Sequence, residues 1–242
     1  KQLGCRSGII AWTHRSRFER GVSLAGSHPT ATLLDYGCGD GTFLTFAAGH
    51  FAASVGADVA PDQIEDCRRR LAGIPGMSFC EIRDLEGPEH TGAFKVVTCM
   101  ETLEHCPEPA LTHVLNDLNR LCAPDGAIII SVPIETGPTF LLKYIVRTLA
   151  AWRGISQYSY YERYSPGVAV RMLFATSRTV IERPEYSYPA LPPHYSHYGF
   201  NWRSLRARIA GELEIEKTEF SPWGWSGGWL SSQVWFVCRP RR

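Results

Sequence analysis

The sequence predicts an α/β protein built on a doubly wound, mainly parallel sheet, and two observations support this prediction. Short apolar segments alternate with amphipathic segments between residues 32 and 132, and strands that alternate with helices form parallel sheets with helices on both faces. The segment 126–132, Gly-Ala-Ile-Ile-Ile-Ser-Val, is apolar almost throughout. Such a run is typical of a central strand that helices cover on both sides.

The elements of this sheet follow one another in a regular order. Short apolar runs predict strands at residues 32–36, 54–59, 77–82, 94–100 and 126–132. Helices are predicted between them, up to about residue 50, from residue 61 to near 73, and over 107–122. Pro61 suits the first turn of its helix. The last of these helices places its leucines three or four positions apart, which gives it one buried face.

The regular alternation ends after residue 132. Residues 134–199 contain one predicted helix, 138–152, and a long stretch that is rich in Tyr and Pro. An insertion of this length inside a domain is usually functional, so we expect a helical and aromatic lid that covers the substrate.

The chain returns to regular structure at Asn201, which is a good N-cap for a helix over 202–210. Two final strands are predicted at 213–220 and 231–238. We therefore expect an N-terminal helix or arm in residues 1–31 and a single domain in residues 32–242, which carries the lid.

The composition excludes several classes of protein. The 242 residues include 25 Lys and Arg against 24 Asp and Glu, and 44% of them are hydrophobic, which excludes disordered and collagen-like chains. The net charge of +1 argues against a general nucleic-acid binder, because such proteins usually carry a strong basic excess. The most apolar predicted helix is interrupted by Lys143 and Arg147 and is too short to span a bilayer. We expect no transmembrane segment.

The eight cysteines are scattered and form no C-x-x-C pair. This arrangement fits neither a disulfide framework nor a zinc site. Several of them lie in apolar runs, where free cysteine behaves as a small core residue. We therefore expect reduced thiols and a cytoplasmic protein.

A glycine-rich loop follows the first predicted strand. The spacing is Asp35-x-Gly37-x-Gly39-x-Gly41, with Cys38 between the first two glycines. Glycine lets a backbone turn tightly and approach a ligand closely, and open α/β sheets bind ligands at this edge. The dinucleotide-binding fingerprint instead separates its second and third glycines by two residues. A tight structural turn without a ligand is the simpler alternative.

Polar residues also follow the next three predicted strands. They are Asp58 with Val59, Asp84 with Leu85, and Met100 with Glu101. Because the carboxyl ends of parallel strands meet at one edge, these residues are expected to lie beside the glycine-rich loop. A carboxylate at the end of the second strand can accept hydrogen bonds from ribose hydroxyls.

With these residues the sequence resembles the class I S-adenosylmethionine-dependent methyltransferases, in their methyltransferase-11/12-like branch. The resemblance is close over residues 32–132 and looser over 201–238. It implies a seven-stranded sheet whose last strand is antiparallel, with S-adenosylmethionine as cofactor and S-adenosylhomocysteine as product. The implied cofactor-binding residues are Asp35, Gly37, Cys38, Gly39, Gly41, Asp58, Val59, Asp84, Leu85, Met100 and Glu101. An NAD-binding Rossmann domain is the alternative, and the glycine spacing counts against it.

A second resemblance concerns the segment after the fourth strand. Glu101-x-x-Glu104-His105 resembles a motif found in two families, the quinone-biosynthesis O-methyltransferases and the small-RNA 3′-terminal 2′-O-methyltransferases. In the RNA enzymes this motif supplies ligands to a divalent metal. His194-x-x-His197 resembles a second histidine element of the RNA enzymes, although one residue is inserted before the following Phe. Glu104 or His105 can instead cap the next helix, with no metal bound.

Methyl transfer to oxygen requires a group that removes the proton of the acceptor. His105 is the first candidate because imidazole titrates near neutral pH, and His197 and His194 come next. Tyr158, Tyr161 and Tyr164 either line the acceptor pocket or pack the lid onto the sheet.

These observations predict a methyltransferase that O-methylates the hydroxyl of a small molecule, a secondary or cell-envelope metabolite. The first alternative is the metal-dependent RNA enzyme, with Glu101, Glu104 and His105 as ligands of a divalent metal; the near-zero charge disfavours nucleic acid. The second alternative is a non-catalytic binding module with a methyltransferase fold. We expect a monomer or a homodimer.

Overall fold

The computed structural model describes residues 8–152, 164–187 and 192–242. Its main sheet has seven strands in the order β3-β2-β1-β4-β5-β9-β8. The strands are β1 (His28–Tyr36), β2 (Phe51–Asp58), β3 (Met77–Glu81), β4 (Phe94–Met100), β5 (Cys122–Pro133), β8 (Leu213–Ser221) and β9 (Gln233–Pro240). The first five are parallel to their neighbours, whereas β9 is antiparallel to β5 and to β8. The predicted fold class is confirmed.

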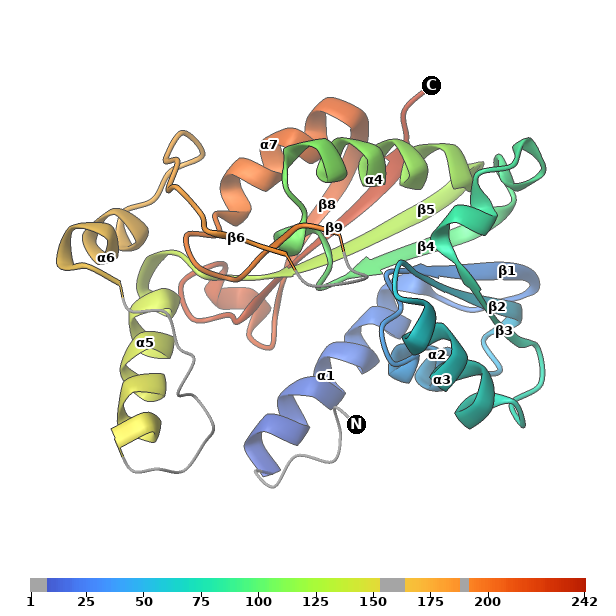
Figure 1. Cartoon of the computed structure of the whole chain (residues 1–242), viewed down its shortest axis with the longest axis horizontal. Helices are drawn as coiled ribbons and strands as arrows, with labels where there is room; N and C mark the ends of the chain where they lie inside the picture. The colour runs from blue at the N-terminus through green and yellow to red at the C-terminus, as the bar shows by residue number, and fades with distance from the viewer. Residues whose placement is uncertain (1–7, 153–163, 188–191) are drawn as a thin grey trace.

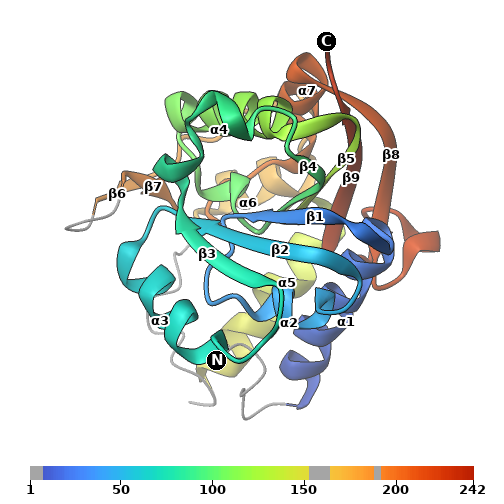
Figure 2. The same ribbon diagram turned by 90° about the vertical axis from the view of Figure 1, so that its right-hand side faces the viewer.

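Helices cover both faces of this sheet (Figure 1). They are α1 (Gly8–Ala25), α2 (Thr42–Ala47), α3 (Pro61–Leu71), α4 (Glu108–Leu121), α5 (Gly137–Trp152), α6 (Pro166–Leu173) and α7 (Trp202–Glu212). The short 3-10 segments are η2 (Ile82–Leu85), η3 (Pro88–His90), η4 (Leu103–His105) and η6 (Gly224–Ser226). Helices α4 and α7 cover one face, and α1, α2 and α3 lie on the other, as Figure 2 also shows.

The alternation of side chains along the central strands builds the two halves of the core. Ile128 and Ile130 of β5 pack in the cluster beneath α4 and α7, whereas Ile129 packs in the cluster on the opposite face. In β9, Phe236 and Trp235 divide in the same way. Successive residues of a strand point to opposite faces, so an unbroken apolar run is what a strand covered on both sides needs.

Three strands begin earlier than predicted, β2 by three residues and β1 and β5 by four. Strand β1 starts at His28, with a register shift against β2 before Thr32. Strand β5 starts at Cys122, with a register shift against β4 between Phe94 and Val96. A Cβ on Gly126 would lie 2.7 Å from the Lys95 carbonyl oxygen, so the chain passes too close to β4 there for any other residue.

Residues 134–199, called the lid segment below, contain three elements besides α5. Helix α6 was not predicted, although Ser165 is its N-cap and Pro166 begins it. The two-stranded sheet of β6 (Glu185–Tyr186) and β7 (His194–Tyr195) was not predicted, because two-residue strands show no period. Tyr158 and Tyr161 lie outside the described residues. Tyr164 stacks on Tyr198 with ring centroids 4.5 Å apart, so it packs the lid segment together. Among the described helices, none is long and apolar enough to cross a membrane.

Candidate active site

Three glycines with positive φ shape the loop between β1 and α2. Gly37, Gly39 and Gly41 have φ angles of 79°, 53° and 70°. A Cβ on Gly37 would lie 2.4 Å from the Thr102 hydroxyl oxygen, and one on Gly41 would lie 2.8 Å from Leu71. A Cβ on Gly39 would meet nothing within 4 Å. Packing therefore requires glycine at the outer two positions, whereas Gly39 leaves open space for a ligand.

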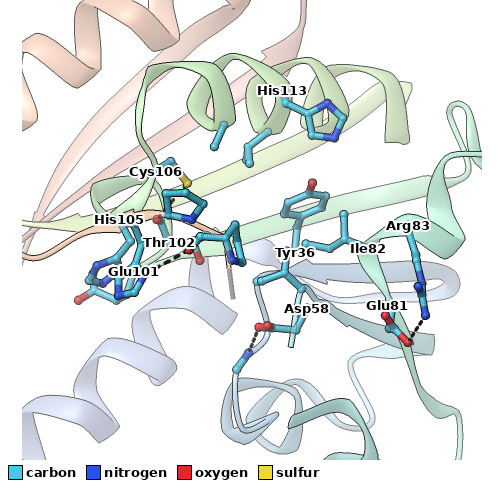
Figure 3. Close-up of a pocket in the computed structure, with 18 of the residues that line it drawn as sticks. Tyr36, Asp58, Glu81, Ile82, Arg83, Glu101, Thr102, His105, Cys106 and His113 are labelled. Carbon is cyan, nitrogen blue, oxygen red and sulfur yellow. Dashed lines mark hydrogen bonds and ion pairs between the residues drawn. The ribbon is translucent and has the colours of Figure 1, made fainter. Parts of the chain in front are cut away.

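That open space belongs to a cavity of about 560 Å³ at the carboxyl ends of the parallel strands (Figure 3). Gly37, Gly39, Asp58, Val59 and Glu101 line it, as predicted for a cofactor site. So do side chains that the sequence did not single out, namely Tyr36, Ile82, Arg83, Thr102 and His113. The cavity is mostly apolar, with a few polar groups at its rim, as ligand sites usually are.

Asp58 is held in place from two sides. One carboxylate oxygen accepts a hydrogen bond from the Gly39 amide at 2.9 Å, and the other accepts one from the Ala60 amide at 3.0 Å. The first bond ties the end of β2 to the glycine-rich loop, so the carboxylate and the loop form one rigid wall of the cavity.

The structure places Asp84 and Leu85 away from the described lining of this cavity. The Asp84 carboxylate accepts a hydrogen bond from the Glu81 amide at 3.0 Å, as part of a capping box on η2, and its side chain is exposed. Leu85 is buried in the core beneath α4. Ile82 and Arg83 take the positions that we predicted for Asp84 and Leu85, because the 3-10 turn directs those side chains to the cavity.

A smaller cavity of about 130 Å³ lies on the other side of the glycine-rich loop. Asp35, Cys38, Met100 and Glu101 line it, as predicted, and Arg17 of α1 also contributes. An Arg17 guanidinium nitrogen lies 3.0 Å from a Glu101 carboxylate oxygen. Sequence reasoning missed Arg17 because nothing near it in the sequence marks it. The two cavities share Gly37, Gly39 and Glu101, so together they form one elongated site.

Two acidic residues of this site have unusual surroundings. Asp35 is 2% exposed and accepts a hydrogen bond from the Thr98 hydroxyl at 2.8 Å; burial raises its pKa to about 7. Glu101 has a φ of 53°, in the left-handed region that residues other than glycine rarely adopt. Strain of this kind costs about 1–3 kcal/mol and is often found at functional sites.

Glu104, His105 and His197 form a second cluster, called the Glu104 cluster below. Among the described residues, their potential ligand atoms lie within 4.8 Å of one another. One Glu104 carboxylate oxygen lies 3.8 Å from His105 Nε2 and 4.0 Å from His197 Nε2. Glu104 is completely buried, and neither of its oxygens has a hydrogen-bond partner among the described residues. An unsatisfied buried carboxyl is costly, so this cluster is suited to binding a further group.

The protonation of the cluster follows from its burial. Burial raises the pKa of Glu104 well above its usual range, and the neighbouring Glu101 carboxylate adds to this effect. Burial also lowers the pKa of His105 to about 4. His105 Nδ1 lies 2.7 Å from the Tyr195 carbonyl oxygen, which can only accept, so Nδ1 carries the proton. The lone pair of His105 Nε2 therefore faces Glu104.

The Glu104 cluster differs from the metal-ligand set of the alternative function, which was Glu101, Glu104 and His105. Glu101 does not join Glu104 and His105, because its left-handed backbone turns the carboxylate toward Arg17. His197 takes its place in the cluster. His194 lies elsewhere, on the wall of the larger cavity, where its Nδ1 is 3.2 Å from the Pro192 carbonyl oxygen.

Arg183 ties the lid segment to the Glu104 cluster. Its guanidinium donates to the carbonyl oxygens of Glu104 and Ser196 at 2.5 Å and to that of Tyr198 at 3.0 Å. The same group lies over the Tyr195 ring, 4.3 Å from its centroid. One side chain thus joins η4 to both sides of His197, and it lies over the ring of Tyr195, whose carbonyl oxygen accepts the proton of His105 Nδ1.

A glycine-rich loop, an anchored strand-end acid and an elongated two-part cavity on this seven-stranded sheet define a class of protein, the S-adenosylmethionine-dependent methyltransferases. The open space at Gly39 and the carboxylate of Asp58 lie in the larger cavity. The smaller cavity places Arg17 beside the acids Asp35 and Glu101.

Comparison with known proteins agrees with this class. Residues 33–126 match the family model for the methyltransferase domain. The ubiquinone biosynthesis O-methyltransferase of Xanthomonas oryzae is 35% identical over 147 residues, which cover 57% of each chain. The chain thus spans a little over half the length of this curated relative. It carries a class I S-adenosylmethionine-dependent methyltransferase domain, and S-adenosylmethionine is the methyl donor of that class.

Solved structures share the fold at low sequence identity. The PH0226 protein of Pyrococcus horikoshii covers the whole chain and 94% of its own length, with a TM-score of 0.59 at 15% identity. The methyltransferase domain of a bacterial CtHen1 protein covers 95% and 99%, with a TM-score of 0.58 at 13% identity. NodS of Bradyrhizobium japonicum, an N-methyltransferase solved with S-adenosylhomocysteine, covers 100% and 95%, with a TM-score of 0.56 at 11% identity.

Proposed function

We propose that this chain transfers the methyl group of S-adenosylmethionine to a hydroxyl oxygen of a small molecule. The observation that carries the proposal is the neutral His105, whose Nδ1–H is held by the Tyr195 carbonyl while its Nε2 lone pair remains available at the edge of the cofactor cavity. The matched relative from Xanthomonas is itself an O-methyltransferase.

In this proposal the cofactor occupies both cavities. Asp58 accepts hydrogen bonds from the ribose hydroxyls, and the larger cavity takes the adenine against Ile82. Arg17 binds the carboxylate of the methionine part, and the acids Asp35 and Glu101 face its ammonium group. The Arg17–Glu101 ion pair is then shared with the ligand, so α1 belongs to the cofactor site.

Catalysis in this proposal depends on position and on proton removal. The cofactor supplies the methyl group, which is attacked in line by the acceptor oxygen. His105 Nε2 takes the hydroxyl proton, and a carboxyl oxygen of the buried Glu104 lies 3.8 Å from this nitrogen. The lid segment excludes water from the acceptor because Arg183 holds it against η4.

Calorimetry with S-adenosylhomocysteine tests the cofactor site. We expect Asp58→Ala to weaken binding at least tenfold, because the ribose loses its acceptor and the Gly39 amide loses its partner. Asp62→Ala, which changes an exposed acid of α3, is the matched control and should bind as the parent does. If the parent binds no S-adenosylhomocysteine, the chain acts instead as a non-catalytic module. If Asp58→Ala binds as tightly as the parent, Asp58 does not bind the cofactor.

Methyl transfer from labelled S-adenosylmethionine tests the acceptor class. The panel contains catechols, glycosides and a short RNA with a free 3′ end, which separates the small-molecule proposal from the RNA alternative. With the best acceptor, His105→Gln should lower kcat about 100-fold, within the range for loss of a general base. Its affinity for S-adenosylhomocysteine should change less than threefold. Methylation of the RNA alone would refute the small-molecule acceptor.

A metal-assisted form of the same reaction is the second candidate, favoured by the unpartnered oxygens of Glu104. Glu104, His105 and His197 would hold a divalent cation, which would orient the acceptor hydroxyl and lower its pKa. Burial raises the pKa of Glu104 above its usual range, so we expect binding of the cation to be accompanied by release of a proton.

This candidate has a test that needs no acceptor. We expect Mg²⁺, Mn²⁺ or Zn²⁺ to raise the Tm of the parent and to release about one proton per bound ion in weakly buffered solution, and Glu104→Gln should abolish both effects. If metal analysis finds no bound ion and chelation leaves turnover unchanged, Glu104 acts only as a partner of His105. We also propose a reducing compartment, the cytoplasm, because the seven described cysteines are unpaired.

A further inference from the structure

Two thiols meet directly beneath the glycine-rich loop. Cys38 lies in the loop between Gly37 and Gly39, and Cys67 lies on α3. Their sulfur atoms lie 3.9 Å and 3.4 Å from the same atom, the Gly39 carbonyl oxygen. The two thiols therefore converge on one carbonyl oxygen of the loop. The local sequence does not predict this contact, because 29 positions separate the two residues.

The surroundings of the two thiols shift their pKa values in opposite directions. The Arg70 guanidinium lies 3.8 Å from the Cys67 sulfur and also donates to the Asp40 carbonyl oxygen at 2.9 Å. The neighbouring Cys38 thiol, together with Arg70, lowers the pKa of Cys67. The neighbouring Cys67 thiol and burial raise the pKa of Cys38. Every other cysteine with a resolved shift in the described part of the chain has a raised pKa.

We propose that Cys38 and Cys67 form a reversible disulfide that weakens cofactor binding when the protein meets a peroxide. The Cys67 thiolate attacks hydrogen peroxide and becomes a sulfenic acid, and the other oxygen leaves as water. The Cys38 sulfur then attacks the Cys67 sulfur and loses its proton, and the sulfenic hydroxyl leaves as a second water. Two thiols and one peroxide thus give one disulfide and two waters.

The disulfide would disturb the cofactor site because of where Cys38 lies. A disulfide bond is about 2.05 Å long, so the two sulfurs, now 3.9 Å and 3.4 Å from the Gly39 carbonyl oxygen, must move together. That movement pulls the loop at a residue flanked by Gly37 and Gly39, both of which line the larger cavity. The Gly39 amide also holds Asp58 at 2.9 Å. This inference rests on the proposed use of the cavity for S-adenosylmethionine.

Access to the thiols depends on the same cavity. Cys67 is 0% exposed and Cys38 is 7% exposed, so only a small oxidant can reach them. Cys38 lines the smaller cavity, to which we assign the methionine part of the cofactor. A bound cofactor should therefore protect both thiols from oxidation.

The experiment uses the whole chain, reduced and then treated with hydrogen peroxide with or without S-adenosylhomocysteine. We expect intact mass to fall by 2 Da and peptide mapping to join Cys38 to Cys67, with slower reaction when S-adenosylhomocysteine is present. Calorimetry should then show at least tenfold weaker binding of S-adenosylhomocysteine, and dithiothreitol should restore it.

Two variants make the result specific to this pair. Cys67→Ser should bind S-adenosylhomocysteine as the reduced parent does, both before and after peroxide. Cys80→Ser removes a half-buried thiol of β3 outside the pair and should respond to peroxide as the parent does. If Cys67→Ser is unstable, Cys67→Ala replaces it.

Two outcomes overturn the proposal. One is the absence of a Cys38–Cys67 disulfide in peroxide-treated protein without ligand, and the other is a complete disulfide that leaves the affinity for S-adenosylhomocysteine unchanged. A reduced parent that binds no S-adenosylhomocysteine overturns the proposed function, and with it the regulatory role of the pair. The mass measurement still decides whether the disulfide forms, so the two failures are distinguishable.

Discussion

Asp35 shows how one residue of the cofactor loop combines binding with a cost in stability. Its carboxyl is buried at the end of β1, with the Thr98 hydroxyl as partner and the Asp58 carboxylate nearby. Burial raises its pKa from 3.8 to about 7. Between these two values the folded state holds a proton that the unfolded state has lost, so stability falls as the pH rises through this window.

The raised pKa of Asp35 predicts how the free energy of unfolding of the cofactor-free chain depends on pH. A difference of one pH unit in pKa corresponds to about 1.4 kcal/mol, and Asp35→Asn removes the buried charge. We expect the free energy of unfolding of D35N to fall less than that of the parent between pH 5 and pH 8, as measured by urea titration. D62N, with an exposed acid changed, is the control. Parallel curves for D35N and the parent would contradict the raised pKa.

The contribution of His105 to stability has the opposite dependence on pH. Its folded pKa of about 4 lies below the usual 6.5, so the stability it contributes is present above pH 6.5 and is lost as the pH falls toward 4. The neutral imidazole at physiological pH is what a general base requires, because a protonated ring has no lone pair to offer.

At the scale of elements, the sheet was predictable and the lid segment was not. The ends of β4 and of α7 were predicted to within two residues. An apolar run marks β4 in the sequence, and the N-cap Asn201 marks the start of α7. Helix α6 was missed although Ser165 caps it and Pro166 begins it, whereas β6 and β7 have only two residues each and are too short to show a period. Helix α6 packs against α5, and β7 contacts η4; no local signal reports these contacts.

Arg183 of the lid segment donates a hydrogen bond to η4 at the Glu104 carbonyl oxygen. Replacing Arg183 tests how much this side chain stabilises the lid segment. Arg183→Met should leave three carbonyl oxygens without this donor, so we expect faster amide hydrogen exchange across residues 181–198. Affinity for S-adenosylhomocysteine should change less than threefold, because Arg183 is outside the described lining of the cofactor cavities. Arg178→Met, an exposed position of the same segment, is the control. Unchanged exchange in R183M would show that other contacts hold the lid segment.

At the scale of the whole molecule, the cofactor site joins both halves of the core. Arg17 comes from a helix on one face, whereas His113 comes from α4 on the other, and the glycine-rich loop lies between them (Figures 1 and 3). A ligand that bridges these parts is expected to stabilise the chain as a unit.

We therefore predict a thermal shift. S-adenosylhomocysteine at 100 times its Kd contributes about 2.7 kcal/mol, and for a chain of this size about 1 kcal/mol raises the Tm by roughly 2–4 °C. The expected rise is about 5–10 °C by calorimetry or fluorescence. Asp58→Ala at the same ligand concentration should show a much smaller rise. A parent whose Tm does not move with ligand would contradict a bridging site.

By itself the sequence determined the glycine-rich loop, the acid at the end of β2 and the parallel sheet, because each depends on neighbours within a few positions. The tertiary structure alone decided which distant side chains complete the site. Arg17 meets Glu101 across 84 positions, and His105 meets the Tyr195 carbonyl across 90. The physical reason is that periodicity and turn chemistry act locally, whereas these contacts depend on how α1 and the lid segment pack against the ends of the strands.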